Sequence, residues 1–193
     1  MIATGNPTPE TKTYTEAEYF NFETQSELRH EYRDGEILET TGGTPNHNQI
    51  AANLITALTF ALRRKPYRAF ITDQHLWISD ANTHTYPDVM VVPEPLELKP
   101  GRRDTVMNPI FVAEVLSKST RNYDLGEKFQ LYQTIPNLME YVTIDQYLPH
   151  IEHHVKTDRG WLLRDIDGLE AKLILESISV EVDFVDLYDK VEF

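Results

Sequence analysis

The chain has 193 residues, no cysteine, and a net charge of −13 from 18 lysines and arginines against 31 acids. This length suits one domain with a substantial core, and the lack of cysteine excludes disulfides, thiolate zinc sites and cysteine nucleophiles. No apolar run approaches the roughly 20 residues that span a bilayer, and residues 1–9 are polar, unlike a signal peptide. We therefore expect a flexible N-terminus over 1–13, one domain over 14–193, no membrane contact and a cytoplasmic location.

The first elements in the chain are a helix and a hairpin. Thr15 and Glu18 have the spacing of a capping box, which predicts a helix to about His30. The pair Asp34-Gly35 favours a tight two-residue turn and predicts a hairpin over residues 32–40.

A second helix follows a break at residues 42–45. Asn46 is the expected N-cap, and the apolar residues recur at helical spacing. This predicted stripe consists of Ile50, Leu54, Leu58 and Leu62. Residues 70–72 and 75–78 are then expected to form short strands.

Two carboxylates lie inside the apolar strands that come next. Asp88 belongs to the run 87–92 and Glu114 to the run 110–116, and both runs are rich in valine, as buried strands are. An unpaired buried carboxylate costs several kcal/mol, so it is usually paired, protonated or bound to a metal. Two of them on neighbouring strands would repel each other unless a cation lay between them. The sequence therefore predicts a divalent-metal site.

A lysine on the following helix is the third candidate. Leu125, Lys128, Phe129 and Tyr132 fall at helical spacing, and capping residues precede them. Lys128 can therefore reach back over the edge of the sheet toward the two acids. Two acids, a metal and an ammonium suit phosphodiester hydrolysis, because the metal activates water and the ammonium offsets charge developing at phosphorus.

The last third of the chain is rich in strands. Residues 141–145 are expected to join the central sheet, and 150–155, 160–163 and 173–175 to form an antiparallel meander. Residues 179–184 end it, before a turn of helix over 185–188. The fold class is therefore α/β (mixed α+β), with a central mixed sheet flanked by helices and extra antiparallel strands at the C-terminus.

Several stretches of the chain, together with His47 at the start of a helix, form a recognisable series. They are residues 30–37 (HEYRDGEI), 86–92 (YPDVMVV), 112–117 (VAEVLS), 124–128 (DLGEK) with Tyr132, and 140–145 (EYVTID). In their order and spacing, from about Tyr14 to the end of the chain, they resemble the Uma-two family of restriction endonucleases, within the PD-(D/E)XK nuclease superfamily.

The resemblance implies a restriction-endonuclease-like fold, an acidic active site that binds Mg²⁺ or Mn²⁺, and DNA as substrate. Asp88 matches the aspartate of the Pro-Asp motif, and Glu114 matches the acid of the second strand. Glu31 matches an N-terminal acid that often joins the metal site. His47 is expected near the site, without an assigned role.

One position departs from the superfamily pattern, which places a lysine two residues after the second acid. That position is Leu116 here. In this family the lysine usually comes from the next helix, and the corresponding residue here is Lys128. Lys118 is the weaker alternative, because it lies about 13 Å further along the strand.

Ordinary structural explanations stay open for each of these residues. Asp88 could accept local backbone hydrogen bonds, Glu114 could pair with a basic residue, and Glu31 could be solvated in a hairpin. Lys128 could form a surface pair with Asp124, four residues earlier, which would contribute only a few tenths of a kcal/mol.

Histidines suggest a second metal site. His150, Glu152 and His154 share one face of an expected strand, but no third ligand is evident nearby in sequence, so a solvent-facing hairpin is the favoured interpretation.

The acidic composition weighs against strong nonspecific DNA binding. Two basic groups exist, 63–65 with Arg68 and Lys99 with 102–103, and they are interpreted as a helix end and a solvated loop, although a phosphate backbone could pass the second.

Two functions are compatible with these features. The first is a metal-dependent endodeoxyribonuclease, with a homodimer suggested by analogy. The alternative is a catalytically silent nuclease-fold module for interaction or nucleic-acid binding.

Overall fold

The computed structural model describes residues 12–40 and 42–193. Of the expected flexible stretch 1–13, residues 1–11 lie outside the described residues. Within the described ranges, no helix combines the length and the apolar character needed to cross a bilayer.

Helix α1 (Glu16–Gln25) has the predicted capping box at Thr15. It ends earlier than predicted, because Ser26 is already extended and His30 begins strand β1 (His30–Arg33). Strand β2 (Glu36–Glu39) returns antiparallel to β1, which confirms the hairpin. Asp34 and Gly35 both have positive φ, 41° and 102°, as the mirror-image hairpin turn requires.

Helix α2 (Pro45–Ala61) buries the predicted apolar stripe. Its N-cap is Thr44 and not the predicted Asn46. Pro45 occupies the first turn, where its missing N–H and fixed φ are tolerated, and the Thr44 side chain accepts a hydrogen bond from the His47 N–H at 3.2 Å. The helix therefore starts one residue before Asn46, and this places His47 in its first turn.

A six-stranded mixed sheet forms the centre of the fold, in the order β11-β10-β9-β8-β6-β3. Only β8 and β9 run parallel, and every other pair is antiparallel. The strands are β3 (Tyr67–Ile71), β6 (Val89–Pro93), β8 (Phe111–Leu116), β9 (Glu140–Asp145), β10 (His150–Thr157) and β11 (Gly160–Asp167).

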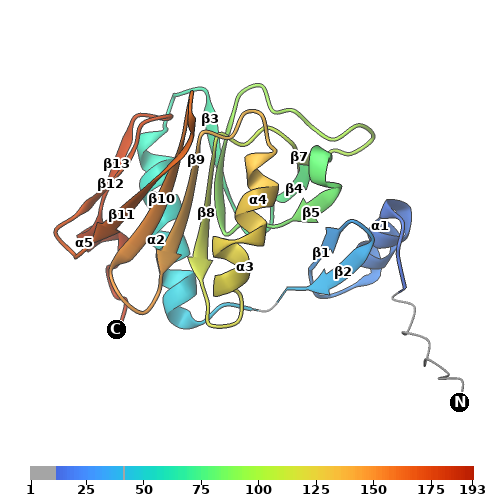
Figure 1. Ribbon diagram of the computed structural model, residues 1–193, viewed down its shortest axis with the longest axis horizontal. Coiled ribbons are helices and arrows are strands. Elements are labelled where there is room, and N and C mark those ends of the chain that lie inside the picture. Colours follow the sequence, from blue (N-terminus) through green and yellow to red (C-terminus); the bar gives the residue numbers. More distant parts are fainter. Residues whose placement is uncertain (1–11, 41) are drawn as a thin grey trace, which may run out of the picture.

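The two faces of this sheet are covered differently (Figure 1). Helix α2 packs on one face together with the hairpin of β12 (Lys172–Leu175) and β13 (Val180–Asp183) and the short helix α5 (Phe184–Leu187). Helix α4 (Glu127–Gln133) packs on the other face. Because both faces are covered, β6 and β8 are buried almost throughout, as their apolar sequences predict.

A second sheet was not expected from the sequence. It has five strands in the order β2-β1-β5-β4-β7, and so the N-terminal hairpin joins strands from the middle of the chain. Those strands are β4 (His75–Ile78), β5 (Thr83–Thr85) and β7 (Thr105–Val106), with the 3₁₀ turn η1 (Ser79–Ala81) between β4 and β5. Residues 75–78 therefore form the predicted strand, but in this smaller sheet.

The C-terminal meander is only partly as predicted. Strands β10 and β11 continue the central sheet, whereas β12 pairs with β13 in a separate hairpin. Apolar side chains on β12 and β13 alternate inward and close the α2 side of the core.

Candidate active site

The predicted site residues come from both sheets and from the helix between them in space. Glu31 lies on β1, Asp88 directly before β6, Glu114 on β8 and Lys128 on α4. All four are buried, with exposed fractions between 4% and 9%. The structure thus brings together four residues that span almost a hundred positions of sequence.

Asp88 and Glu114 are neighbours because of strand register. Val89 pairs with Ala113 in the antiparallel β6–β8 ladder, so the preceding residue Asp88 lies opposite Glu114. The Asp88 N–H lies 3.4 Å from Glu114 Oε2, and the Val115 N–H donates to Asp88 Oδ2 at 2.8 Å. The backbone therefore holds both carboxylates in place.

Lys128 reaches this pair from a helix that is broken in its middle. The expected single helix is divided into α3 (Arg121–Leu125) and α4, with Gly126 at the junction. Lys128 Nζ lies 2.9 Å from Glu114 Oε1 and 3.4 Å from Glu31 Oε1. Lys118, by contrast, is exposed on the turn after β8, near the ring of Tyr147.

Sequence reasoning gave too little weight to two residues of the same helical segment. Asp124 is buried, 3.7 Å from Lys128 Nζ, and so this is no surface pair. Tyr132 is fully buried in the core, and its hydroxyl donates to Glu114 Oε1 at 2.7 Å. Their positions four residues before and after Lys128 were the available signal, since in the single helix expected from the sequence such residues share a face.

Thr85 and Arg33 were missed, because they belong to the unexpected second sheet. The Thr85 hydroxyl donates to Glu31 Oε1 and fixes that carboxylate beside Lys128. Arg33 follows Glu31 on the same face of β1, pairs with Glu127 and lies over the Tyr123 ring at 4.5 Å. The five-stranded sheet thus forms one wall of the site.

His47 contacts the site from the other side of the central sheet. Its Nε2 lies 3.1 Å from Asp88 Oδ2. Burial lowers the pKa of His47, but the Asp88 carboxylate outweighs burial and leaves this pKa above its usual value. His47 therefore carries positive charge beside Asp88 more readily than a solvated histidine does.

The electrostatics of the site are dominated by negative charge. Among the described residues, the carboxylates of Glu31, Glu114 and Asp124 lie within 3.7 Å of the Lys128 ammonium, and the Asp88 carboxylate lies beside Glu114. Burial, together with Asp88 and Asp124, raises the pKa of Glu114 to about 8 against the effect of Lys128. Burial opposes the charge of Lys128, yet Glu114 and Glu31 hold its pKa well above the usual range.

This donor set fits a divalent cation. Mg²⁺ and Mn²⁺ prefer oxygen ligands, and Asp88 and Glu114 supply carboxylates at adjacent positions, with Glu31 nearby. The raised pKa of Glu114 indicates that, without a cation, a proton relieves the excess of negative charge. A divalent ion would take the place of that proton.

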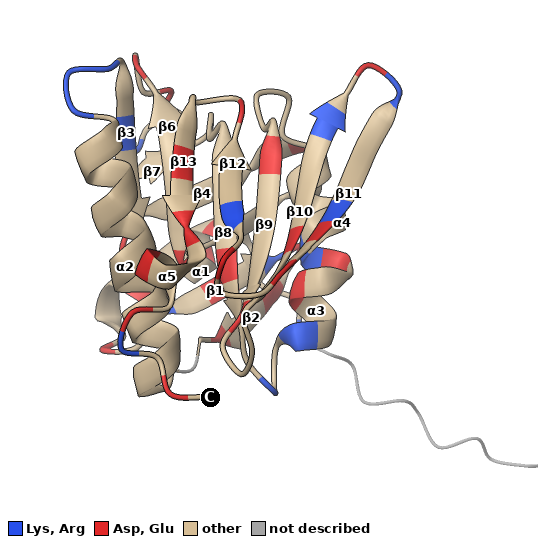
Figure 2. Cartoon of the chain, turned by 90° about the vertical axis from the view of Figure 1, so that its left-hand side faces the viewer, with Lys and Arg blue, Asp and Glu red and all other residues tan. Residues whose placement is uncertain are grey.

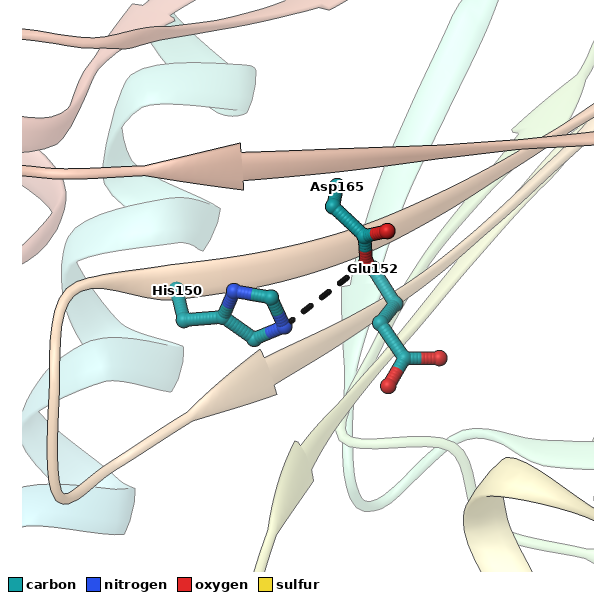
Figure 3. Close-up of side chains that lie close together, drawn as sticks. All are labelled: His150, Glu152 and Asp165. Atoms are coloured by element: carbon teal, nitrogen blue, oxygen red, sulfur yellow. Dashed lines mark ion pairs between the residues drawn. The ribbon is translucent and has the colours of Figure 1, made fainter.

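A separate group of side chains lies at the far edge of the central sheet (Figure 3). His150, Glu152 and Asp165 direct ligand atoms to within 4.8 Å of one another, and Asp165 comes from the paired strand β11. Asp165 therefore supplies the third potential ligand, which was not evident nearby in sequence. His154 does not join the group, because it is buried against Phe129, so the favoured solvent-facing position is wrong for His154 and the alternative of two imidazoles on one metal is not realised.

The basic groups have different surroundings. Lys99 is buried, 2.8 Å from Glu16 and over the ring of Trp77, and Arg102 pairs with Asp104. The expectation of a solvated loop, or of a phosphate path, was therefore wrong for Lys99. The other group lies at the turn between α2 and β3, where Figure 2 shows a run of basic residues.

Comparisons with known proteins agree with this fold. The family model for Uma2, described as "Putative restriction endonuclease", matches residues 16–184. The chain belongs to the Uma2 family. It is 39% identical over 164 residues to the uncharacterized protein sll1609 of Synechocystis sp., covering 84% of this chain and 93% of that one. It is 35% identical over 186 residues to slr1290 of the same organism, covering 94% and 96%.

A solved structure has the same fold. It is described as a putative nuclease belonging to DUF820 from Anabaena variabilis, and it matches with a TM-score of 0.72 over 90% of this chain and 97% of that one, at 14% sequence identity. The comparison confirms the predicted mixed α/β fold, with a central sheet flanked by helices.

Proposed function

We propose that this chain is a metal-dependent endodeoxyribonuclease that uses Mg²⁺ or Mn²⁺. The observation that carries the proposal is the buried pair of Asp88, directly before β6, and Glu114, on the adjacent strand β8, with the Lys128 ammonium 2.9 Å from Glu114. The family description and the related nuclease-type fold support hydrolysis of a nucleic acid. Residues 14–193 would act as one catalytic domain.

Asp88 and Glu114 would hold the metal, and Glu31 would add a ligand directly or through water. When bound, such an ion lowers the pKa of a coordinated water and binds a phosphate oxygen. Carboxylates fixed by backbone N–H groups and by Tyr132 suit this task, because little reorganisation is needed.

Lys128 would act through its positive charge. Its raised pKa keeps it an ammonium at neutral pH, so it donates hydrogen bonds and does not abstract a proton. It would orient the attacking water beside Glu114 or stabilise charge on the phosphate. His47, paired with Asp88, would keep that carboxylate oriented toward the metal.

The experiment is cleavage of supercoiled plasmid and single-stranded DNA with Mn²⁺ or Mg²⁺, comparing wild type with Asp88→Ala and Glu114→Gln. Asp165→Asn serves as the matched control, since it removes a carboxylate from the separate group on β10 and β11. We expect metal-dependent cleavage by wild type and the control, and at least a 100-fold loss in both site variants. Equal cleavage by wild type and Asp88→Ala would reveal a contaminating nuclease and overturn the proposal.

A further inference from the structure

Strand β3 leaves one side of the central sheet open. It is the end strand and pairs with β6 in the register of Arg68 with Val92 and Phe70 with Met90. The bonds from Glu94 N–H to the Pro66 carbonyl and from Thr72 N–H to the Asp88 carbonyl flank this ladder. In antiparallel strands, only every second residue exchanges backbone hydrogen bonds with the neighbouring strand. Arg68 and Phe70 are in phase with the two flanking bonds and face β6. Ala69 lies between them and directs its N–H and carbonyl to the open side.

The surface beside this edge is apolar. Phe60 on α2 is 73% exposed and Ile71 on β3 is 48% exposed. Two neighbouring hollows share Ile55; one is lined by Ala69 and Ile71, the other by Phe60. A continuous apolar surface next to unpaired strand groups is typical of an interface.

Charges at the two ends of this surface are opposite. Arg63 lines the hollow near Phe60, close to the start of β3, and Asp73 lines the hollow near Ile71, just beyond its end. Within the chain, Asp73 also pairs with Arg29, and Arg68 pairs with Glu94. An antiparallel copy of the same surface would place the basic end of one chain beside the acidic end of the other.

We propose that a second copy of this chain docks here, through antiparallel pairing of β3 with its counterpart and packing of α2 against α2 across a two-fold axis. The interface is self-complementary, as a two-fold dimer requires. Strand pairing satisfies the open backbone groups, the apolar side chains of α2 and β3 cover each other, and the charged ends match.

This arrangement has a consequence that rests on the proposed nuclease function. The two-fold axis of antiparallel strands is perpendicular to the sheet, so both candidate active sites lie on the same face of the joined sheet. Asp88 lies opposite Thr72, three residues along β3 from Ala69, where the axis would pass. With about 3.3 Å per residue along a strand and about 4.8 Å between strands, the two Asp88 residues would lie about 25 Å apart. One duplex could then contact both sites.

The test is sedimentation velocity of the full chain from about 1 to 100 µM, without DNA or metal. We expect wild type at twice the 22.4 kDa chain mass, and Phe60→Asp as a folded monomer with an unchanged circular dichroism spectrum. Ala69→Pro should also be monomeric, because it removes an outward N–H and no bond to β6. Leu162→Asp, an exposed apolar position on the opposite edge strand β11, is the matched control and should remain dimeric.

A monomeric wild type throughout this range would overturn the proposal. A dimer that persists in both β3-side variants, or one that is lost in Leu162→Asp, would place the interface elsewhere and also overturn it. The readout does not involve cleavage, so its failure is distinct from failure of the proposed function.

Discussion

The ammonium of Lys128 lies 2.9 Å from a carboxylate oxygen of Glu114, although the two residues belong to different elements, α4 and β8. Leu116, where the wider nuclease pattern has its lysine, is buried on β8. The helix thus supplies at Glu114 the positive charge that the strand lacks. The break at Gly126 lies two residues before Lys128, at the start of the helix that carries it.

Replacing Lys128 with methionine should destabilise the protein, because it leaves buried carboxylates without their cation. We expect the free energy of unfolding in urea at pH 8 to fall by about 3 kcal/mol without metal. The control is Lys172→Met, which removes an exposed lysine that also pairs with two acids, Glu181 and Asp183, and should change stability little. An equal loss of unfolding free energy in the two variants would contradict the conclusion that Lys128 neutralises a buried cluster of carboxylates.

Tyr132→Phe should weaken metal binding in a pH-dependent way. The hydroxyl donates to Glu114 and favours its charged form, so its removal raises the pKa of Glu114 further. Because a metal must displace the proton, calorimetry should show a larger loss of Mn²⁺ affinity at pH 7 than at pH 9.

Tyr141→Phe is the control for this change. Its hydroxyl is equally buried but donates to the backbone carbonyl of Asp124. It should lower stability without altering the pH dependence of Mn²⁺ binding. The same pH dependence in both variants would show that Tyr132 acts only as a core residue.

Two buried histidines in the five-stranded sheet should make the free energy of unfolding fall as the pH decreases. Burial lowers the pKa of His75 to about 3 and that of His84 to about 4, from an ordinary value near 6.5. Below pH 6.5 the unfolded chain therefore binds protons that the folded chain does not, and stability falls as pH decreases. Each histidine contributes a slope of up to about 1.4 kcal/mol per pH unit between its two pKa values.

The measurement is urea unfolding between pH 4.5 and 8 for wild type and His75→Gln/His84→Gln. The double variant should show a shallower decline below pH 6.5, even if it is less stable at pH 8. An identical slope would mean that other groups cause the acid sensitivity.

The sequence predicted those parts of the fold that rest on local patterns. The capping box at Thr15, the Asp34-Gly35 turn and the stripe of α2 each depend on nearby residues, and all are present. The second sheet and the isolated β12–β13 hairpin depend on which strands pair across long separations. Apolar alternation does not specify a partner, so these pairings could not be inferred.

The candidate site shows the same division. Asp88 and Glu114 stand out because charge inside an apolar run is costly, and Lys128 lies one helix later. Thr85 and Arg33 carry no such signal, since their neighbours in space come from the unexpected sheet. The sequence placed Asp124 four residues before Lys128, but the pair was interpreted as lying on an exposed helix face, whereas Asp124 is buried.

The central claim is that Asp88 and Glu114 share one divalent cation, and metal-dependent melting tests it most directly. The melting temperature of wild type, Asp88→Asn and Glu114→Gln would be measured with increasing Mn²⁺ and Mg²⁺. At about 100 times its Kd, a ligand adds roughly 2.7 kcal/mol of stability, which corresponds to a rise of about 5–10 °C for a chain of this size. We predict this rise in wild type and its loss in both variants; no rise in wild type, or an equal rise in all three, would contradict the claim.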